Sequence, residues 1–147
     1  MKLEVERSRH SDMSLLRHLA FVLADNGRRS AALENAARAC ELSPRDARTW
    51  SDRGCVQVKL GELRDAVVSY TRALEIDRDF TVGWHNLGVT LARLGQLRAA
   101  LCALRNAQML DGRRASTSLA LGKLLVEAGL IDAALASFAR AERLTRQ

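Results

Sequence analysis

The sequence is poor in the residues that sheets and tight turns require. Among its 147 residues, aromatic side chains make up only 4% and there is a single proline, Pro44. A β-sandwich builds its core from β-branched and aromatic strands that are separated by many turns. This composition therefore argues against a β-sandwich, whereas the abundant Ala and Leu suit helices.

Long hydrophobic runs are also missing. No apolar run approaches the length of about 18 residues that a transmembrane helix needs. The N-terminus, MKLEVERSRHSD, is charged throughout and lacks the apolar stretch of a secretory signal. We therefore predict a cytoplasmic protein without membrane insertion. Its widely spaced cysteines, Cys40, Cys55 and Cys102, are expected to be reduced thiols that act as small buried hydrophobic groups.

The residue patterns of catalytic and metal sites are missing too. The three histidines, His10, His18 and His85, lie far apart, and no Cys/His cluster has the spacing of a zinc site. No glycine-rich loop has the pattern of a phosphate-binding loop. We therefore predict no enzyme activity, no catalytic residue, no metal, no cofactor and no small-molecule substrate.

The chain carries more basic than acidic residues. The formal net charge is +6, with 23 Lys and Arg against 17 Asp and Glu. A basic excess can attract nucleic acid or an acidic protein partner. Here the basic residues are scattered, and the few aromatics are needed for the core. The basic stripe with stacking platforms that is typical of a nucleic-acid binder is therefore absent, and we expect no nucleic-acid partner.

What the sequence does contain is one period, repeated four times. Glycine recurs every 34 residues, at Gly27, Gly61, Gly95 and Gly129. The same spacing relates further columns of small residues, namely Ala32, Ala66, Ala100 and Ala134; Ala39, Ala73, Ala107 and Ala141; and Ala20, Gly54, Gly88 and Gly122. Independent columns that share one period indicate a repeat protein.

Each unit is predicted to form a pair of helices. In the third unit, a first helix over about residues 81–94 places four apolar residues on one face, Trp84, Leu87, Leu91 and Leu94. Gly95 follows at the position where glycine commonly ends a helix. A second helix is predicted over about residues 98–110.

Small residues set how the two helices of a unit cross. Gly88 and Ala100 have little or no side chain, so we expect the helices to approach closely there. Trp84 is expected to fill the notch that Gly88 leaves and to pair with Leu104. Burial of roughly 150–250 Å² would offset the entropy cost of ordering the tryptophan.

These residues resemble the signature of the tetratricopeptide repeat family, W-x2-L-G-x2-Y followed by A-x3-F, A and P. The third unit carries Trp84, Leu87, Gly88, Leu91, Ala100, Leu104 and Ala107 at these positions. The resemblance covers residues 13 to 147. It implies an all-α fold, a right-handed α-solenoid of antiparallel helix pairs.

The repeat divides the chain. We expect an N-terminal extension, 1–12, and four repeats that form one solenoid domain, 13–46, 47–80, 81–114 and 115–147. Ser11 or Asp12 is the candidate N-cap of the first helix, and residues 1–10 are either disordered or an extension of that helix. Three departures from the signature, Arg53, Gln57 and Ser118, are expected to weaken local packing.

The resemblance also implies a binding surface. In this family, the first helices of successive repeats line a concave groove that takes an extended or helical segment of another protein. Carried over from the family, the groove positions are Arg17, His18, Phe21, Arg48, Asp52 and Cys55 in the first two repeats, and Val82, His85, Asn86, Val89, Arg93, Leu119 and Lys123 in the last two.

Two chemical features of these positions suggest how a partner is held. Phe21, Val82, Val89 and Leu119 supply apolar anchors, which usually dominate binding energy, and Asn86 can bind a ligand backbone through its amide. Arg17, Arg48, Arg93 and Lys123 add positive charge, which Asp52 partly offsets.

The function predicted from these features is a non-catalytic scaffold or adaptor that binds a protein or peptide partner. Two alternatives stay open. One is a secretion-type chaperone. The other is a structural protein that forms homo-oligomers through exposed solenoid ends, because the last repeat leaves Leu135, Phe138 and Leu144 incompletely covered.

Overall fold

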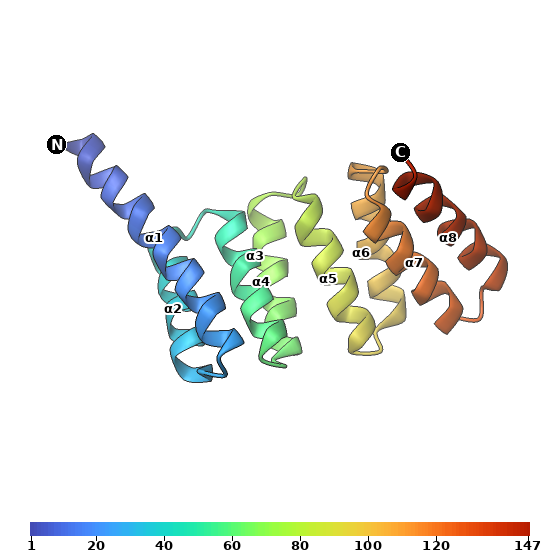
Figure 1. Cartoon of the computed structure of the whole chain (residues 1–147), viewed down its shortest axis with the longest axis horizontal. Helices are drawn as coiled ribbons and strands as arrows, with labels where there is room; N and C mark the ends of the chain where they lie inside the picture. Colours follow the sequence, from blue (N-terminus) through green and yellow to red (C-terminus); the bar gives the residue numbers. More distant parts are fainter. The chain divides into compact units, whose positions relative to one another are not determined.

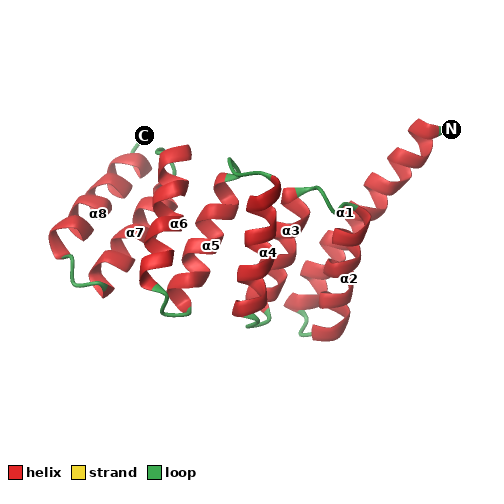
Figure 2. Cartoon of the chain, turned by 180° about the vertical axis from the view of Figure 1, so that it is seen from behind, coloured by secondary structure: helices red, strands yellow, loops and turns green.

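The structure, a computed structural model, describes residues 1–147 and consists of eight α-helices without a strand (Figure 1, Figure 2). The predicted all-α class is therefore confirmed. The helices are α1 (Lys2–Asp25), α2 (Arg29–Leu42), α3 (Ala47–Lys59), α4 (Leu63–Ile76), α5 (Thr81–Arg93), α6 (Leu97–Leu110), α7 (Ala115–Glu127) and α8 (Ile131–Thr145).

The helices form two compact units. Unit 1 spans Met1–Arg78 with helices α1 to α4, and unit 2 spans Asp79–Gln147 with helices α5 to α8. Within each unit, consecutive helices pair as antiparallel hairpins, α1 with α2, α3 with α4, α5 with α6 and α7 with α8. The first helix of the second hairpin also packs on both helices of the first, so α3 contacts α1 and α2, and α7 contacts α5 and α6.

The recurring glycines end the first helix of every hairpin. Gly27, Gly61, Gly95 and Gly129 all have positive φ, between 71° and 79°, which only glycine adopts without strain. After α5, the Gly95 N–H donates to the Ala92 carbonyl at 2.9 Å and the Gln96 N–H to the Leu91 carbonyl at 3.0 Å. This is the Schellman pattern, which satisfies carbonyls that the helix leaves unpaired.

A second glycine column lets the two helices of a hairpin cross closely, but tryptophan does not fill the notch. A Cβ at Gly88 would lie 2.6 Å from Leu104 Cγ, and one at Gly54 would lie 2.6 Å from the Tyr70 ring. The expectation that Trp84 fills the notch beside Gly88 is therefore wrong. The side chain comes from the second helix instead, because its inward residue points straight at the glycine.

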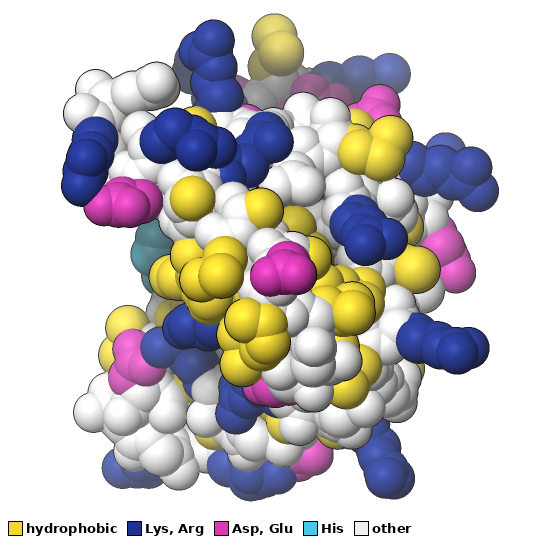
Figure 3. Space-filling view, turned by 90° about the vertical axis from the view of Figure 1, so that its right-hand side faces the viewer, with side chains coloured by type: hydrophobic (Ala, Val, Ile, Leu, Met, Phe, Trp, Pro, Cys, Tyr) yellow, Lys and Arg dark blue, Asp and Glu magenta, His cyan; other side chains and the backbone are white.

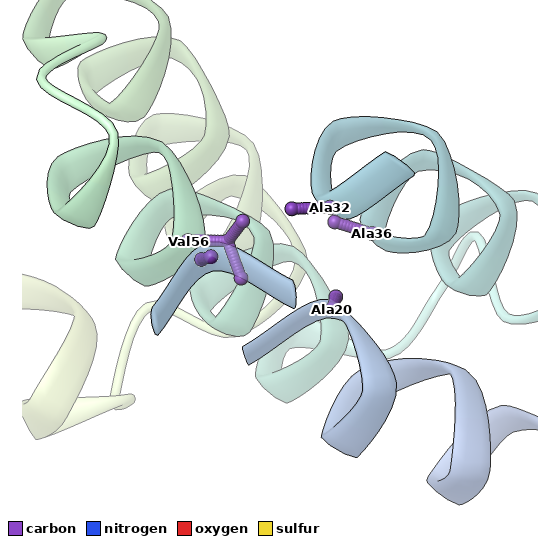
Figure 4. Packing of buried hydrophobic residues seen from close by; sticks show 5 residues of the cluster. Ala20, Ala32, Ala36 and Val56 are labelled. Atoms are coloured by element: carbon purple, nitrogen blue, oxygen red, sulfur yellow. The ribbon is translucent and has the colours of Figure 1, made fainter. Parts of the chain in front are cut away.

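Alanine plays the same role in the core of unit 1. Ala20, Ala32, Ala36 and Val56 come from three helices and are at most 4% exposed (Figure 4). Their side chains are short, so the helix axes lie close together. Phe21 packs against this cluster and is half-buried.

Two of the three departures from the signature are compensated. Gln57 is buried, and the Ser69 hydroxyl donates to its Oε1 at 2.6 Å. The Arg53 guanidinium lies 5.5 Å from the centre of the Trp50 ring, which is a cation–π distance. Each of these two polar groups thus has a partner, and the expected weakening of local packing at these positions stays a prediction. Ser118 is different, since its hydroxyl is buried without a partner.

Two further expectations need correction. Helix α1 begins at Lys2, so neither Ser11 nor Asp12 is an N-cap, and residues 2–10 extend the helix beyond α2 (Figure 1). That stretch contains neither Gly nor Pro, so nothing in it interrupts the helix. Among the thiols, Cys40 is buried as predicted, whereas Cys102 is exposed on α6.

Candidate functional site

The predicted groove positions lie on the first helix of each hairpin, which is α1 or α3 in unit 1 and α5 or α7 in unit 2. In unit 1 the predicted charges are largely paired with one another. The Arg17 guanidinium forms an ion pair with the Asp52 carboxylate, which joins α1 to α3. Lys59 Nζ lies 2.6 Å from Asp25 Oδ1 and makes a second link between these helices. Arg48 is exposed and its side chain forms no ion pair.

The other predicted positions in unit 1 are also engaged. Burial raises the pKa of the Cys55 thiol, and the Tyr70 hydroxyl donates to Cys55 Sγ at 3.3 Å. His18 is exposed, with its Nδ1 2.7 Å from the Ser14 carbonyl oxygen. The space between Arg17, Phe21 and the core is too small to hold a water molecule. Unit 1 therefore presents a closed and mostly neutralised surface at these positions.

Unit 2 has an open pocket between α5 and α7. Its volume is about 170 Å³, and its lining residues are Val89, Ala92, Arg93, Leu104, Ala120, Lys123, Leu124 and Glu127. Three of the predicted groove residues, Val89, Arg93 and Lys123, thus line the same pocket. The floor is apolar, because Leu104 of α6 and Leu124 of α7 are at most 2% exposed.

The rim of this pocket carries unpaired positive charge. Arg93 and Lys123 are both exposed, and neither forms an ion pair with Glu127, the one acidic residue of the lining. An apolar floor beside two cations suits a ligand that has an apolar side chain next to a carboxylate.

A hydrogen-bonded histidine connects the two helices that form the pocket. His85 Nδ1 of α5 lies 3.0 Å from Thr117 Oγ1 of α7, and Thr117 is fully buried. Burial lowers the pKa of His85, and the positive charge of Arg114 lowers it further. The neutral imidazole is therefore favoured. Of the remaining predicted residues, Val82 and Asn86 are half-buried, and Leu119 is 42% exposed on α7.

The prediction missed part of the pocket. Ala92, Leu104 and Leu124 line it, although the repeat pattern assigned Leu104 to the core. Ala92 stands three positions after Val89, so helical spacing alone was a signal for it. No group of three or more His, Cys, Asp or Glu residues is placed to hold a metal ion, and none of the helices has the length and apolarity to cross a bilayer.

Comparisons with known proteins agree with this arrangement of helices. A family model described as tetratricopeptide repeat matches residues 47–80. A crystal structure of MamA matches with a TM-score of 0.81 at 18% identity, over 97% of this chain and 84% of that one. MamA from Desulfovibrio magneticus RS-1 gives a TM-score of 0.79 at 19% identity, over 91% of this chain and 76% of that one.

A third match is to the Pseudomonas aeruginosa protein pilF, with a TM-score of 0.83 at 21% identity, over 95% of this chain and 64% of that one. No curated protein matches the sequence. At these identities the solved structures establish the fold, an α-solenoid of antiparallel helix pairs. The family model identifies a tetratricopeptide repeat at residues 47–80, which agrees with the resemblance drawn from the period of 34 residues.

Proposed function

We propose that the protein is a non-catalytic interaction scaffold or adaptor, and that the first helices of its repeats form a concave surface that binds a segment of a partner protein. The observation that supports this most is the pocket between α5 and α7, where three predicted groove residues, Val89, Arg93 and Lys123, meet around an apolar floor. Repeat proteins generally use extended surfaces of this kind for binding.

The chemistry of the pocket also suggests what the partner segment looks like. An apolar side chain of the partner fills the space above Leu104 and Leu124, and an acidic group lies between Arg93 and Lys123. A secretion-type chaperone is a special case of this proposal, in which the segment belongs to an export substrate. We also propose a reducing compartment such as the cytoplasm, in which the three cysteines stay thiols.

A second candidate function is self-association through the end of unit 2. Leu130, Ile131 and Leu135 are 51%, 53% and 61% exposed, and Phe138 and Leu144 are half-buried. Figure 3 views this side of the molecule and shows hydrophobic side chains gathered near its centre, with Lys and Arg around them. An exposed apolar patch with a polar rim is typical of an interaction surface.

The experiment for the first proposal removes the two rim cations together. The protein is immobilised and exposed to a lysate of its source cell, and retained proteins are identified by mass spectrometry. We expect Arg93→Ala/Lys123→Ala to lose a partner that the wild type retains, because the acidic group loses both cations. Exposed cations of solvated pairs contribute about 1 kcal/mol or less each, so the loss is roughly ten-fold in affinity.

The control carries the same change of charge on another helix. Arg98→Ala/Arg105→Ala alters two exposed arginines of α6 and should retain the partner. If both double variants lose the partner equally, net charge rather than the pocket governs binding. If both retain it fully, the pocket between α5 and α7 is not the site.

A further inference from the structure

Unit 1 has a hollow that the proposed binding surface does not use. It lies between α1 and α2 and has a volume of about 540 Å³. Its lining is apolar apart from one acidic and one basic residue, and consists of Asp12, Leu15, Leu16, Leu19, Arg38 and Leu42. Leu15, Leu19 and Leu42 are 65%, 45% and 44% exposed, so the hollow opens to solvent.

The outward side of α1 matches a face that is covered elsewhere in the chain. Leu15 and Val22 are 65% and 55% exposed. One period later, the matching residues of α3, Thr49 and Val56, are each 1% exposed, because α1 and α2 pack against α3. The matching residues of α7, Thr117 and Leu124, are likewise buried. The repeat therefore identifies the stripe Leu15–Leu19–Val22 as a face on which another helix packs.

The second repeat shows what fills the matching hollow. The residues 34 positions after the lining are Asp46, Thr49, Trp50, Arg53, Arg72 and Ile76. There, the Trp50 indole lies under two guanidinium groups, with its ring centre 5.5 Å from Arg53 Cζ and 6.0 Å from Arg72 Cζ. Its Nε1–H donates to the Pro44 carbonyl at 3.0 Å.

The first repeat keeps the cation but not the aromatic ring. Arg38 stands at the position of Arg72, whereas Leu16 stands at the position of Trp50. A leucine side chain is smaller than an indole, so the space that Trp50 occupies in the second repeat stays open in the first. The hollow thus has an apolar wall and a guanidinium, as does the surrounding of the Trp50 indole in this same chain.

We propose that the hollow between α1 and α2 is a docking pocket for an aromatic side chain, carried by a helix of a partner protein that lies along Leu15, Leu19 and Val22. The aromatic ring lies under the Arg38 guanidinium, as the Trp50 ring lies under Arg72. A cation over an aromatic face adds to the apolar contact with the leucines.

A second copy of this chain fits the stripe less well. In the α2–α3 junction, the Cys40 thiol points at the Thr49 carbonyl, with Sγ and O 3.7 Å apart. The residue of α8 that matches Cys40 is Glu142, and the residue of α1 that matches Thr49 is Leu15. Stacking α8 on α1 in the same way places the Glu142 carboxylate against the Leu15 carbonyl, and two hydrogen-bond acceptors cannot pair with each other.

The test uses a single-residue probe, so that it does not depend on the sequence of the partner. N-acetyltryptophanamide is titrated to millimolar concentration into the full chain with isotope-labelled leucine methyl groups, and N-acetylleucinamide is the matched control. We expect saturable shifts at Leu15, Leu16, Leu19 and Leu42 with the tryptophan probe, and much smaller shifts with the leucine probe.

Two variants test the role of the Arg38 cation and the role of the open space beside Leu16 separately. Arg38→Gln should lower the affinity for the tryptophan probe by roughly two- to five-fold, because an exposed cation–π contact is lost. Leu16→Trp should fill the hollow as Trp50 does and abolish binding, with a far-ultraviolet circular dichroism spectrum like that of the wild type. If Leu16→Trp does not fold, Arg38→Gln and the leucine probe still decide the matter.

Several results would overturn the proposal. These are equal binding of the two probes, no effect of Arg38→Gln, no binding at millimolar concentration, or shifts centred on Leu104 and Leu124 in unit 2. A mass that doubles with concentration and returns to that of a monomer in Leu19→Asp would assign the stripe to a second copy. Arg93→Ala/Lys123→Ala should leave the probe affinity unchanged, so this proposal and the proposed function can fail separately.

Discussion

At the residue scale, two buried serines, Ser69 of α4 and Ser118 of α7, differ in whether their hydroxyl has a hydrogen-bond partner. Ser69 and Ser118 are 3% and 1% exposed. The Ser69 hydroxyl donates to Gln57 Oε1, whereas the Ser118 hydroxyl has no hydrogen-bond partner. A buried polar group without a partner keeps its desolvation cost, and a paired one recovers it. The two positions should therefore respond to the same substitution in opposite ways.

Ser118→Ala should raise the free energy of unfolding by about 1 kcal/mol, because it removes an unpaired hydroxyl and improves helix propensity. Ser69→Ala should lower it by about 1–2 kcal/mol, because Gln57 is left buried without its donor. Urea denaturation followed by circular dichroism measures both. A loss of stability in Ser118→Ala would mean that its hydroxyl is bonded in solution.

At the scale of helices, the contact between His85 and Thr117 joins α5 to α7 and depends on the protonation state. The folded protein favours the neutral imidazole, because burial and Arg114 lower the pKa of His85 below its ordinary value of 6.5. In the unfolded chain this histidine binds a proton at higher pH than in the folded protein. The contribution of His85 to folding stability is therefore present above its ordinary pKa of 6.5 and is lost as the pH falls through that value.

We expect the free energy of unfolding to decrease as the pH falls through 6.5, the ordinary pKa of His85, and the decrease to be smaller in His85→Gln. Glutamine can still reach Thr117 but does not titrate. His18→Gln, which removes an exposed histidine of α1, is the matched control. Identical pH profiles for wild type and His85→Gln would show that His85 does not contribute.

At the scale of the whole molecule, the second candidate function concerns the exposed apolar end of unit 2, through which we propose that two copies associate. A pairing of α8 with the same helix of a second copy would be symmetric, so one substitution changes both sides of the contact. Leu135 is 61% exposed and contributes little to the core of its own chain.

For this second candidate function we expect a mass in analytical ultracentrifugation that rises with protein concentration in the wild type and stays that of a monomer in Leu135→Glu. The thermal midpoint extrapolated to low concentration should not change. Val68→Glu, at an exposed valine of α4, is the control and should behave like the wild type. A wild type that stays monomeric at all concentrations would exclude association through this end.

The helical fold could be predicted almost entirely from the sequence. The period of 34 residues predicted helices over 81–94 and 98–110, and α5 and α6 span Thr81–Arg93 and Leu97–Leu110. Glycine ended the helices as predicted, because a positive φ is a local property of the backbone that glycine alone tolerates. The start of α1 was not predictable from capping residues, since Ser11 and Asp12 can also lie within a continuous helix.

The sequence by itself determined the helix pairs and the columns of small residues at which they cross, because both depend on residues only a few positions apart or one period apart. The tertiary structure alone decided which predicted groove residues are open to a ligand. Arg17 and Asp52 are 35 positions apart and neutralise each other, whereas Arg93 and Lys123 stay unpaired beside a pocket. The physical reason is that ion pairs and hollows depend on where side chains of different helices meet. The spacing of residues along one helix does not determine those positions.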